Sequence, residues 1–163
     1  MRPGGPPELR PLRAADEPAA RDLIDRSFPP YLRELPHYHL TLALGDTASD
    51  ESRGIVVTDG DRLAGVVLHG FVAGAVRTGK IHVLAVRADI RRRGIGRALL
   101  DAATRALASA DARLIVVELP ADPDLEAVRP MLHASGFREE ASVGDFVRDG
   151  VALLVLVRGL GEG

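Results

Sequence analysis

The chain has 163 residues, of which 46% are hydrophobic and 27% are charged, with a formal net charge of −2 and no cysteine. This length and composition predict a single globular domain and exclude a disulfide-stapled scaffold or a predominantly disordered chain. The slightly acidic total argues against a nucleic-acid or anionic-membrane partner. No apolar run reaches the length of about 18 residues that suggests a membrane span.

The start of the chain, MRPGGPPELR, lacks the apolar segment of a secretory signal. We expect residues 1–7 to form a disordered lead and residues 8–160 to form the domain. The absence of cysteine fits a reducing compartment, so the expected location is cytoplasmic.

The first half of the chain predicts two strand regions separated by helix. Residues 8–13 predict a strand at a sheet edge, because Pro11 removes a backbone donor. Asp16 offers a helix cap, and apolar residues follow at helical spacing up to Phe28. Residues 31–45 are ambiguous and are compatible with one short broken helix. Residues 54–74 predict a β-hairpin that turns at Asp59-Gly60-Asp61.

The second half begins with a predicted strand over residues 78–90. The clearest helix of the chain comes next, with one apolar stripe formed by Ile95, Leu99, Ala103, Ala106, Leu107 and Ala110. Residues 112–120 are mostly apolar, and we interpret them as one continuous apolar strand of the kind buried on both faces. A short helix should end at Gly136, with Pro130 either kinking it or delaying its start. Residues 137–160 predict two strands joined near Asp149-Gly150.

This order predicts an α/β domain with a mixed sheet of about seven strands and helices on both faces. The strands at 78–90 and 112–120 are linked through a helix, so they should be parallel.

The segment between that strand and that helix reads Arg91-Arg92-Arg93-Gly94-Ile95-Gly96. Two interpretations compete: a solvated basic turn with flexible glycines, or a binding site for an anion on the free amides of a helix N-terminus. The flanking elements favour the anion site, and a pyrophosphate would fit it. No Lys-Ser/Thr follows the glycines, as a Walker loop requires, and the spacing does not suit a dinucleotide fingerprint.

With this loop, the element order and the pair Gly136-Phe137 after the last helix, the chain resembles the GNAT superfamily of acyl-CoA-dependent N-acetyltransferases. The phosphate loop of that family reads Gln/Arg-x-x-Gly-x-Gly/Ala, which residues 91–96 match. The likeness extends over roughly residues 8–157.

The resemblance implies a specific site for acetyl-CoA. The two parallel strands should splay apart, and pantetheine should pair with the backbone around Leu84, Ala85 and Val86. The pyrophosphate should bind the loop residues Arg91, Arg92, Arg93, Gly94, Ile95, Gly96 and Arg97. The implied reaction moves an acetyl group to a primary amine of a small molecule or peptide, by direct attack in a ternary complex, since no cysteine can carry an acetyl-enzyme.

His82, on the strand before the loop, is the best candidate for the base that deprotonates the amine. The alternative is a strand histidine satisfied by water. His69 is a weaker candidate with a structural role favoured. His37, Tyr38 and His39 fall in the segment that shapes the acceptor pocket in this family, and His-x-His alone is weak support for a metal.

Other positions depart from the family pattern. Leu132 stands where a general-acid tyrosine is frequent, Leu125 where an asparagine is frequent, and Val147 where a further tyrosine often follows Asp145-Phe146. His133 is adjacent to Leu132 but should lie on the surface. These departures leave an alternative open, a catalytically weak acyl-CoA-binding regulatory module of the same fold. A homodimer is also compatible with the resemblance.

Overall fold

The computed structural model describes residues 7–45, 51–91 and 93–161, so most of the expected lead, residues 46–50, Arg92 and residues 162–163 lie outside the described residues. The strands are β1 (Glu8–Pro11), β2 (Arg53–Asp59), β3 (Arg62–Phe71), β4 (Thr78–Val86), β5 (Leu114–Pro120), β6 (Arg138–Arg148) and β7 (Val151–Gly159). The helices are α1 (Glu17–Ser27), α2 (Glu34–Ala43), α3 (Ile95–Ser109) and α4 (Val128–Ala134). Short 3-10 turns are η1 (Ala14–Asp16), η2 (Pro30–Leu32), η3 (Ala88–Ile90) and η4 (Pro123–Leu125).

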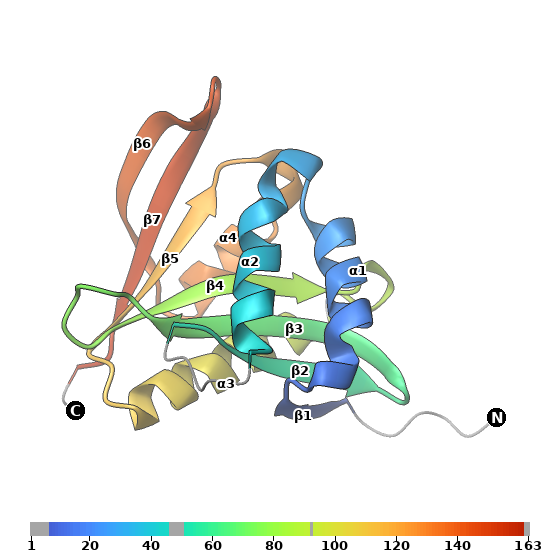
Figure 1. Cartoon of the computed structure of the whole chain (residues 1–163). Helices are drawn as coiled ribbons and strands as arrows, with labels where there is room; N and C mark the ends of the chain where they lie inside the picture. Colours follow the sequence, from blue (N-terminus) through green and yellow to red (C-terminus); the bar gives the residue numbers. More distant parts are fainter. Residues whose placement is uncertain (1–6, 46–50, 92, 162–163) are drawn as a thin grey trace.

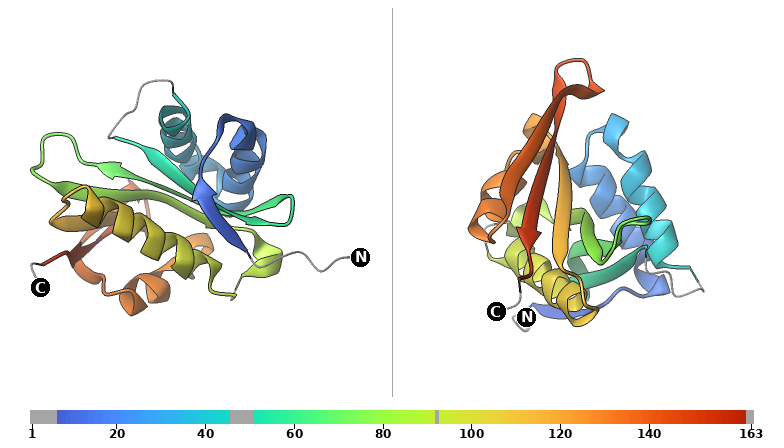
Figure 2. Two further views of the ribbon diagram at one scale, coloured as in Figure 1. Left: turned by 90° about the horizontal axis from the view of Figure 1, so that it is seen from below. Right: turned by 90° about the vertical axis from the view of Figure 1, so that its left-hand side faces the viewer.

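The seven strands form one sheet in the order β1-β2-β3-β4-β5-β7-β6. Among the described strands, β4 and β5 pair in parallel and all other neighbours are antiparallel. Helices α1 and α2 cover one face of the sheet, while α3 and α4 lie on the other (Figures 1 and 2). The predicted fold class, strand number and parallel pair are confirmed.

Each face of the sheet has its own apolar core. On the α3 and α4 side, the core includes Leu99, Leu107, Ile115, Leu132 and Leu156. On the α1 and α2 side, it includes Ile24, Leu40, Val66, Val83 and Ala85. Burial of aliphatic side chains on both faces supplies the main favourable free energy for this three-layer arrangement.

Both predicted hairpins and the predicted helix end form. Gly60 and Gly150 turn the hairpins with φ of +64° and +80°, and Gly136 follows α4 with φ of +89°. Positive φ is favoured by glycine because it has no Cβ. The ambiguous stretch 31–45 becomes η2 followed by α2. Pro130 lies in the first turn of α4, which tolerates it, so the predicted helix starts late rather than kinking.

Two details of the predicted burial were wrong. Helix α3 buries Leu100 and Thr104 in addition to Ile95, Leu99, Ala103 and Leu107, because it packs on β2, β3 and β4 at once, while Ala110 lies past its end and is exposed. Strand β5 is not buried on both faces. Ile115, Val117 and Leu119 are buried, but Glu118 is exposed on the opposite face.

Candidate active site

A cleft opens where β4 and β5 stop pairing. The parallel ladder runs from Thr78 opposite Leu114 to Ile81 opposite Val117 and then ends, although β4 continues to Val86 and β5 to Pro120. Beyond Ile81, the two strands diverge, as the sequence resemblance implies. We call this opening the β4–β5 cleft.

His82 occupies a β-bulge at the point of divergence. In the β3–β4 ladder, Leu68 is opposite Val83 and His69 is opposite Ile81, so His82 is the extra residue on β4. A bulge re-aims the side chains that follow it. Ile81 therefore belongs to the core on the α3 side, whereas Val83 belongs to the core on the α1 side.

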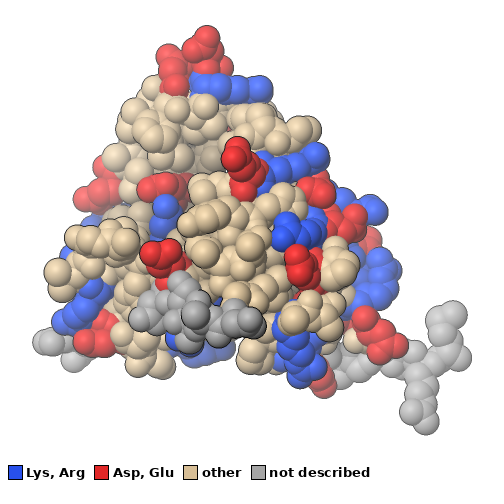
Figure 3. All heavy atoms as spheres, in the orientation of Figure 1, with Lys and Arg blue, Asp and Glu red and all other residues tan. Residues whose placement is uncertain are grey.

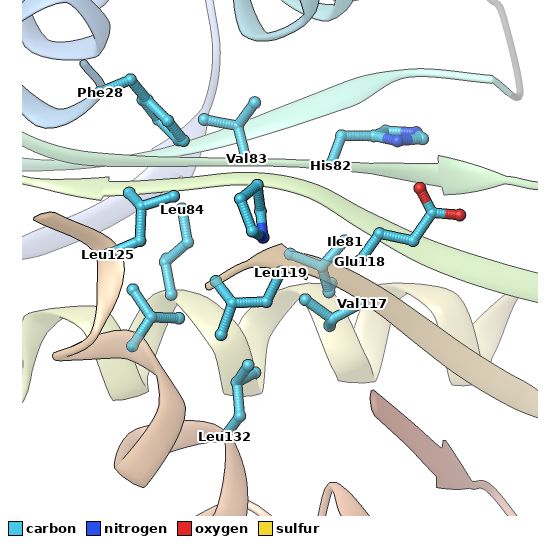
Figure 4. A pocket seen from close by; sticks show the side chains of 12 residues that line it. Phe28, Ile81, His82, Val83, Leu84, Val117, Glu118, Leu119, Leu125 and Leu132 are labelled. Atoms are coloured by element: carbon cyan, nitrogen blue, oxygen red, sulfur yellow. The ribbon is translucent and has the colours of Figure 1, made fainter. Parts of the chain in front are cut away.

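The β4–β5 cleft is lined mainly by apolar side chains, with two polar ones. Its empty space amounts to about 460 Å³, counted out to its open mouth. Phe28, Leu84, Leu119, Leu125, Val128 and Leu132 are among the apolar residues of the lining. The polar side chains are His82 and Glu118, which extend toward the same side of the cleft, away from Leu125 (Figure 4). Leu125 and Leu132 do face the cleft, so neither position of the family pattern supplies a proton donor there.

The backbone of β4 presents groups to this cleft that are not used in the ladder with β3. The Arg87 amide donates to the Ala64 carbonyl of β3 at 2.8 Å. Because backbone groups alternate direction along a strand, those of Val86 and Leu84 point away from β3, toward the cleft. The Val86 carbonyl accepts a hydrogen bond from Arg91 Nε at 3.2 Å, which is consistent with this orientation.

The loop over residues 91–97, which we call the glycine loop, joins β4 and η3 to α3. Gly94 is the N-cap residue of α3 with φ of +77°, and a Cβ there would meet no described atom within 4 Å. Among the described residues, no side chain caps the first amides of α3. Arg91, Arg93 and Arg97 are exposed beside them. A helix N-terminus with free amides, open space and added cations has the properties of an anion site.

Gly96 and Ile95 position the start of α3. Ile95 is buried in the core, and a Cβ at Gly96 would lie 3.1 Å from Met131 Sδ and 3.5 Å from Val86 Cγ2. The first turn of α3 therefore lies against β4 and α4, next to the cleft. Arg92, the remaining residue predicted for this loop, is outside the described residues.

His82 stacks on His39 of α2. The ring centroids are 3.7 Å apart and the planes differ by 9°. His82 Nε2 lies 2.7 Å from the Glu51 carbonyl, and since a carbonyl only accepts, Nε2 is the protonated nitrogen. Burial, reinforced by His39, lowers the pKa of His82 to about 4, so its ring is neutral near pH 7. Its Nδ1 is buried and has no partner among the described residues.

Glu118 is a site residue that the sequence analysis missed. Its carboxylate Oε2 lies 3.1 Å from Nζ of Lys80, and its side chain is 44% exposed. The continuous apolar run around it suggested a strand buried on both faces. The signal that could have identified it was the single charge within β5, which alternation places on the face opposite Val117 and Leu119.

A second contact missed in the sequence joins the α1–α2 connection to the segment after β5. The Tyr31 hydroxyl donates to Asp122 Oδ2 at 2.5 Å, and the Asp122 Oδ1 accepts from the Asp124 amide at 2.9 Å. The Arg148 guanidinium lies 3.8 Å from the centre of the Tyr31 ring. Burial and the hydrogen bond to Asp122 raise the pKa of Tyr31, which keeps its hydroxyl protonated.

The remaining histidines separate in space. His37 contacts Asp25 at 2.7 Å, whereas His39 turns to His82, so the His-x-His pattern does not converge. His69 is buried on β3, and burial lowers its pKa to about 4. His133 is exposed on α4 near Glu139, as expected. Within residues 7–45, 51–91 and 93–161, no group of three or more His, Cys, Asp or Glu residues is placed to hold a metal ion.

Charge is mixed over the face that carries α1 and α2. Acidic and basic side chains alternate across this view without forming one large patch of either sign (Figure 3). In the part of the chain that the structure describes, no helix has the length and apolar character needed to cross a membrane.

Comparisons with known proteins agree on one family. Residues 18–137 match the acetyltransferase (GNAT) family. The fold is similar to that of a GNAT-family structure from Desulfovibrio desulfuricans, with a TM-score of 0.86, 21% identity, and coverage of 96% of this chain and 100% of that one. No curated protein matches the chain in sequence.

Two further solved structures share the fold. The ribosomal-protein-S18-alanine N-acetyltransferase from Escherichia coli has a TM-score of 0.76 and 18% identity, covering 97% of this chain and 96% of its own. A chain of the NatC complex bound to Gag peptide and CoA has a TM-score of 0.77 and 18% identity, covering 96% of this chain and 100% of its own. At such identities, the likeness concerns the fold.

Proposed function

Because the chain belongs to the acetyltransferase (GNAT) family, we propose that it transfers an acetyl group from acetyl-CoA to a primary amine of a small molecule or peptide, by direct attack in a ternary complex. The observation that carries the proposal is the β4–β5 cleft, which opens beside an uncapped helix N-terminus with a glycine at its N-cap. An extended ligand with an anionic end fits these two features together.

In this proposal, the pyrophosphate of acetyl-CoA binds the amides at the start of α3. Gly94 leaves room for the anion, and the first-turn amides carry about half a positive charge. Arg91, Arg93 and Arg97 supply further positive charge from exposed positions. Arg92 is included in the proposed phosphate-binding loop because it belongs to the sequence motif of residues 91–96.

The pantetheine arm would lie along the free edge of β4. Leu84 and Val86 direct their backbone groups into the cleft, so they can pair with the amides of the arm, while Ala85 between them faces β3. The apolar walls formed by Leu119, Val128 and Leu132 exclude water from the thioester. Arg91 would release the Val86 carbonyl when the arm binds.

The two polar residues of the cleft lining, His82 and Glu118, are the candidates for removing the proton of the amine. An alkylamine with a pKa near 10.4 is mostly protonated at neutral pH, so a base is required. We propose His82, neutral and at the bulge, for this role, acting directly or through water. Glu118 is a second candidate, because its carboxylate lies at the same mouth and is more exposed.

Leu132 and Leu125, which stand at the positions of the frequent tyrosine and asparagine, are buried leucines in the lining and donate no proton. A thiolate needs less protonation to leave than an alkoxide does, so the loss of this donor need not abolish turnover.

Thiol release from acetyl-CoA over a panel of amines and peptides tests the proposal, together with CoA-dependent thermal stabilisation. Amine-dependent thiol release supports an enzyme. Stabilisation by CoA with no thiol release for any amine would favour the acyl-CoA-binding module, to which the apolar residues at positions 125, 132 and 147 point.

A further inference from the structure

Lys80 is the only lysine in the chain. Lysine and arginine together number 21, so the other 20 are arginines. This sole lysine lies on β4, opposite Val116, one residue before the last pair of the parallel β4–β5 ladder. The chain thus places its one side-chain primary amine at the fork from which the β4–β5 cleft opens.

The Lys80 ammonium forms an ion pair with Glu118 at the mouth of the cleft. Its Nζ is 3.1 Å from Oε2 of Glu118, a residue of the cleft lining, and its side chain is 21% exposed. Its positive charge also contributes to lowering the pKa values of His39 and His82. No other side chain of the chain can present a primary amine there.

We propose that Lys80 is a self-acetylation site: in the absence of an acceptor, the protein transfers the acetyl group of its own bound acetyl-CoA to Lys80 Nζ. The inference rests on the proposed function, since it uses the same cleft and the same thioester. Arginine could form the ion pair with Glu118 equally well, with a bidentate geometry, but it does not react as a primary amine.

The reaction balances without a further reactant. The Lys80 ammonium first loses a proton, for which the Glu118 carboxylate is within reach. The Nζ lone pair then attacks the thioester carbonyl carbon, an N–C bond forms and the C–S bond breaks. The products are Nζ-acetyl-lysine, coenzyme A as the free thiol, and one proton released to solvent. Acetylation removes the positive charge and with it the ion pair to Glu118.

Mass spectrometry of the full chain incubated with acetyl-CoA, without added amine, tests this. We expect the mass to rise by one acetyl group. Trypsin cleaves after Lys80 only when it is unmodified, so acetylation replaces the peptide Ile81–Arg87 with Thr78–Arg87. This missed cleavage distinguishes Lys80 from the amino terminus of the chain, and Lys80→Arg should abolish it.

Two controls separate cleft-directed transfer from solution chemistry. Gly94→Glu, whose affinity for CoA should be more than about tenfold weaker, and urea-unfolded wild type should each modify Lys80 at least about tenfold more slowly at the same subsaturating acetyl-CoA concentration. Equal rates in these controls would overturn the proposal. If CoA stabilises the protein and added amines are acetylated while Lys80 stays unmodified, this inference fails and the proposed function stands. If CoA neither stabilises the chain nor supports any transfer, the proposed function itself fails.

Discussion

The imidazole rings of His39 and His82 lie face to face, 3.7 Å apart, and join α2 to the bulge of β4. Burial lowers the pKa of both residues, most strongly that of His82. Two protonated rings at this distance would repel each other, so the contact disfavours protonation of both histidines at once. The stability of the structure around the cleft should therefore depend on pH.

The free energy of unfolding should fall between pH 7 and pH 5. His69 and His82 have pKa values of about 4 in the folded protein, against 6.5 for an ordinary histidine. Over this interval, the unfolded chain binds protons that the folded chain does not, so acid favours unfolding. The loss at pH 5 should be on the order of 2 kcal/mol for each histidine. Urea titrations at both pH values measure it.

His82→Gln should reduce this pH dependence by about half. The same loss of stability in wild type and His82→Gln would show that the stacked pair does not carry the effect.

Gly94→Glu should weaken CoA binding more than about tenfold, or 1.4 kcal/mol. The substitution adds bulk and negative charge where the pyrophosphate is proposed to bind, at a backbone φ of +77°. Isothermal titration calorimetry measures the affinity. Gly74→Glu is the matched control, because Gly74 has φ of +83° and equally open surroundings in the β3–β4 connection. Equal affinities for both variants would contradict the proposed site.

His82→Ala should lower kcat by about 10²–10⁴ while CoA affinity changes little, if this ring is the base. Since the folded pKa is about 4, the rate attributable to His82 should show no inflection near pH 6.5. Glu118→Gln is the comparison, because it removes the other candidate base without changing its size. A larger loss of kcat in Glu118→Gln than in His82→Ala would assign proton removal to the carboxylate.

Tyr31→Phe should lower the free energy of unfolding by about 1–2 kcal/mol. The change removes the hydroxyl that donates to Asp122, a carboxylate only 6% exposed. Thermal or urea denaturation measures the effect. Tyr38→Phe removes the same group from a 53% exposed ring and should change stability by less than about 0.5 kcal/mol. Equal stabilities for both variants would mean that the Tyr31–Asp122 bond contributes little.

The elements and their order follow from local patterns. Helical spacing of apolar residues located α1 and α3, and β-rich runs around Gly60 and Gly150 located the hairpins. The glycine loop was recognisable for a similarly local reason, because Gly94 and Gly96 stand directly between a strand and an amphipathic helix. Such features involve residues near one another in the chain, so they can be predicted from the sequence without knowledge of the tertiary packing.

The chemistry at the mouth of the cleft depends on tertiary structure. Glu118 joins His82 in the lining of the cleft because the strands diverge after Ile81 and Val117, and the position of that divergence is set by the packed sheet. The stack of His39 on His82 joins residues 43 positions apart, and the bond from Tyr31 to Asp122 joins residues 91 apart. Side chains so distant in sequence meet only when the sheet and its helices pack, and burial then sets which of them are charged.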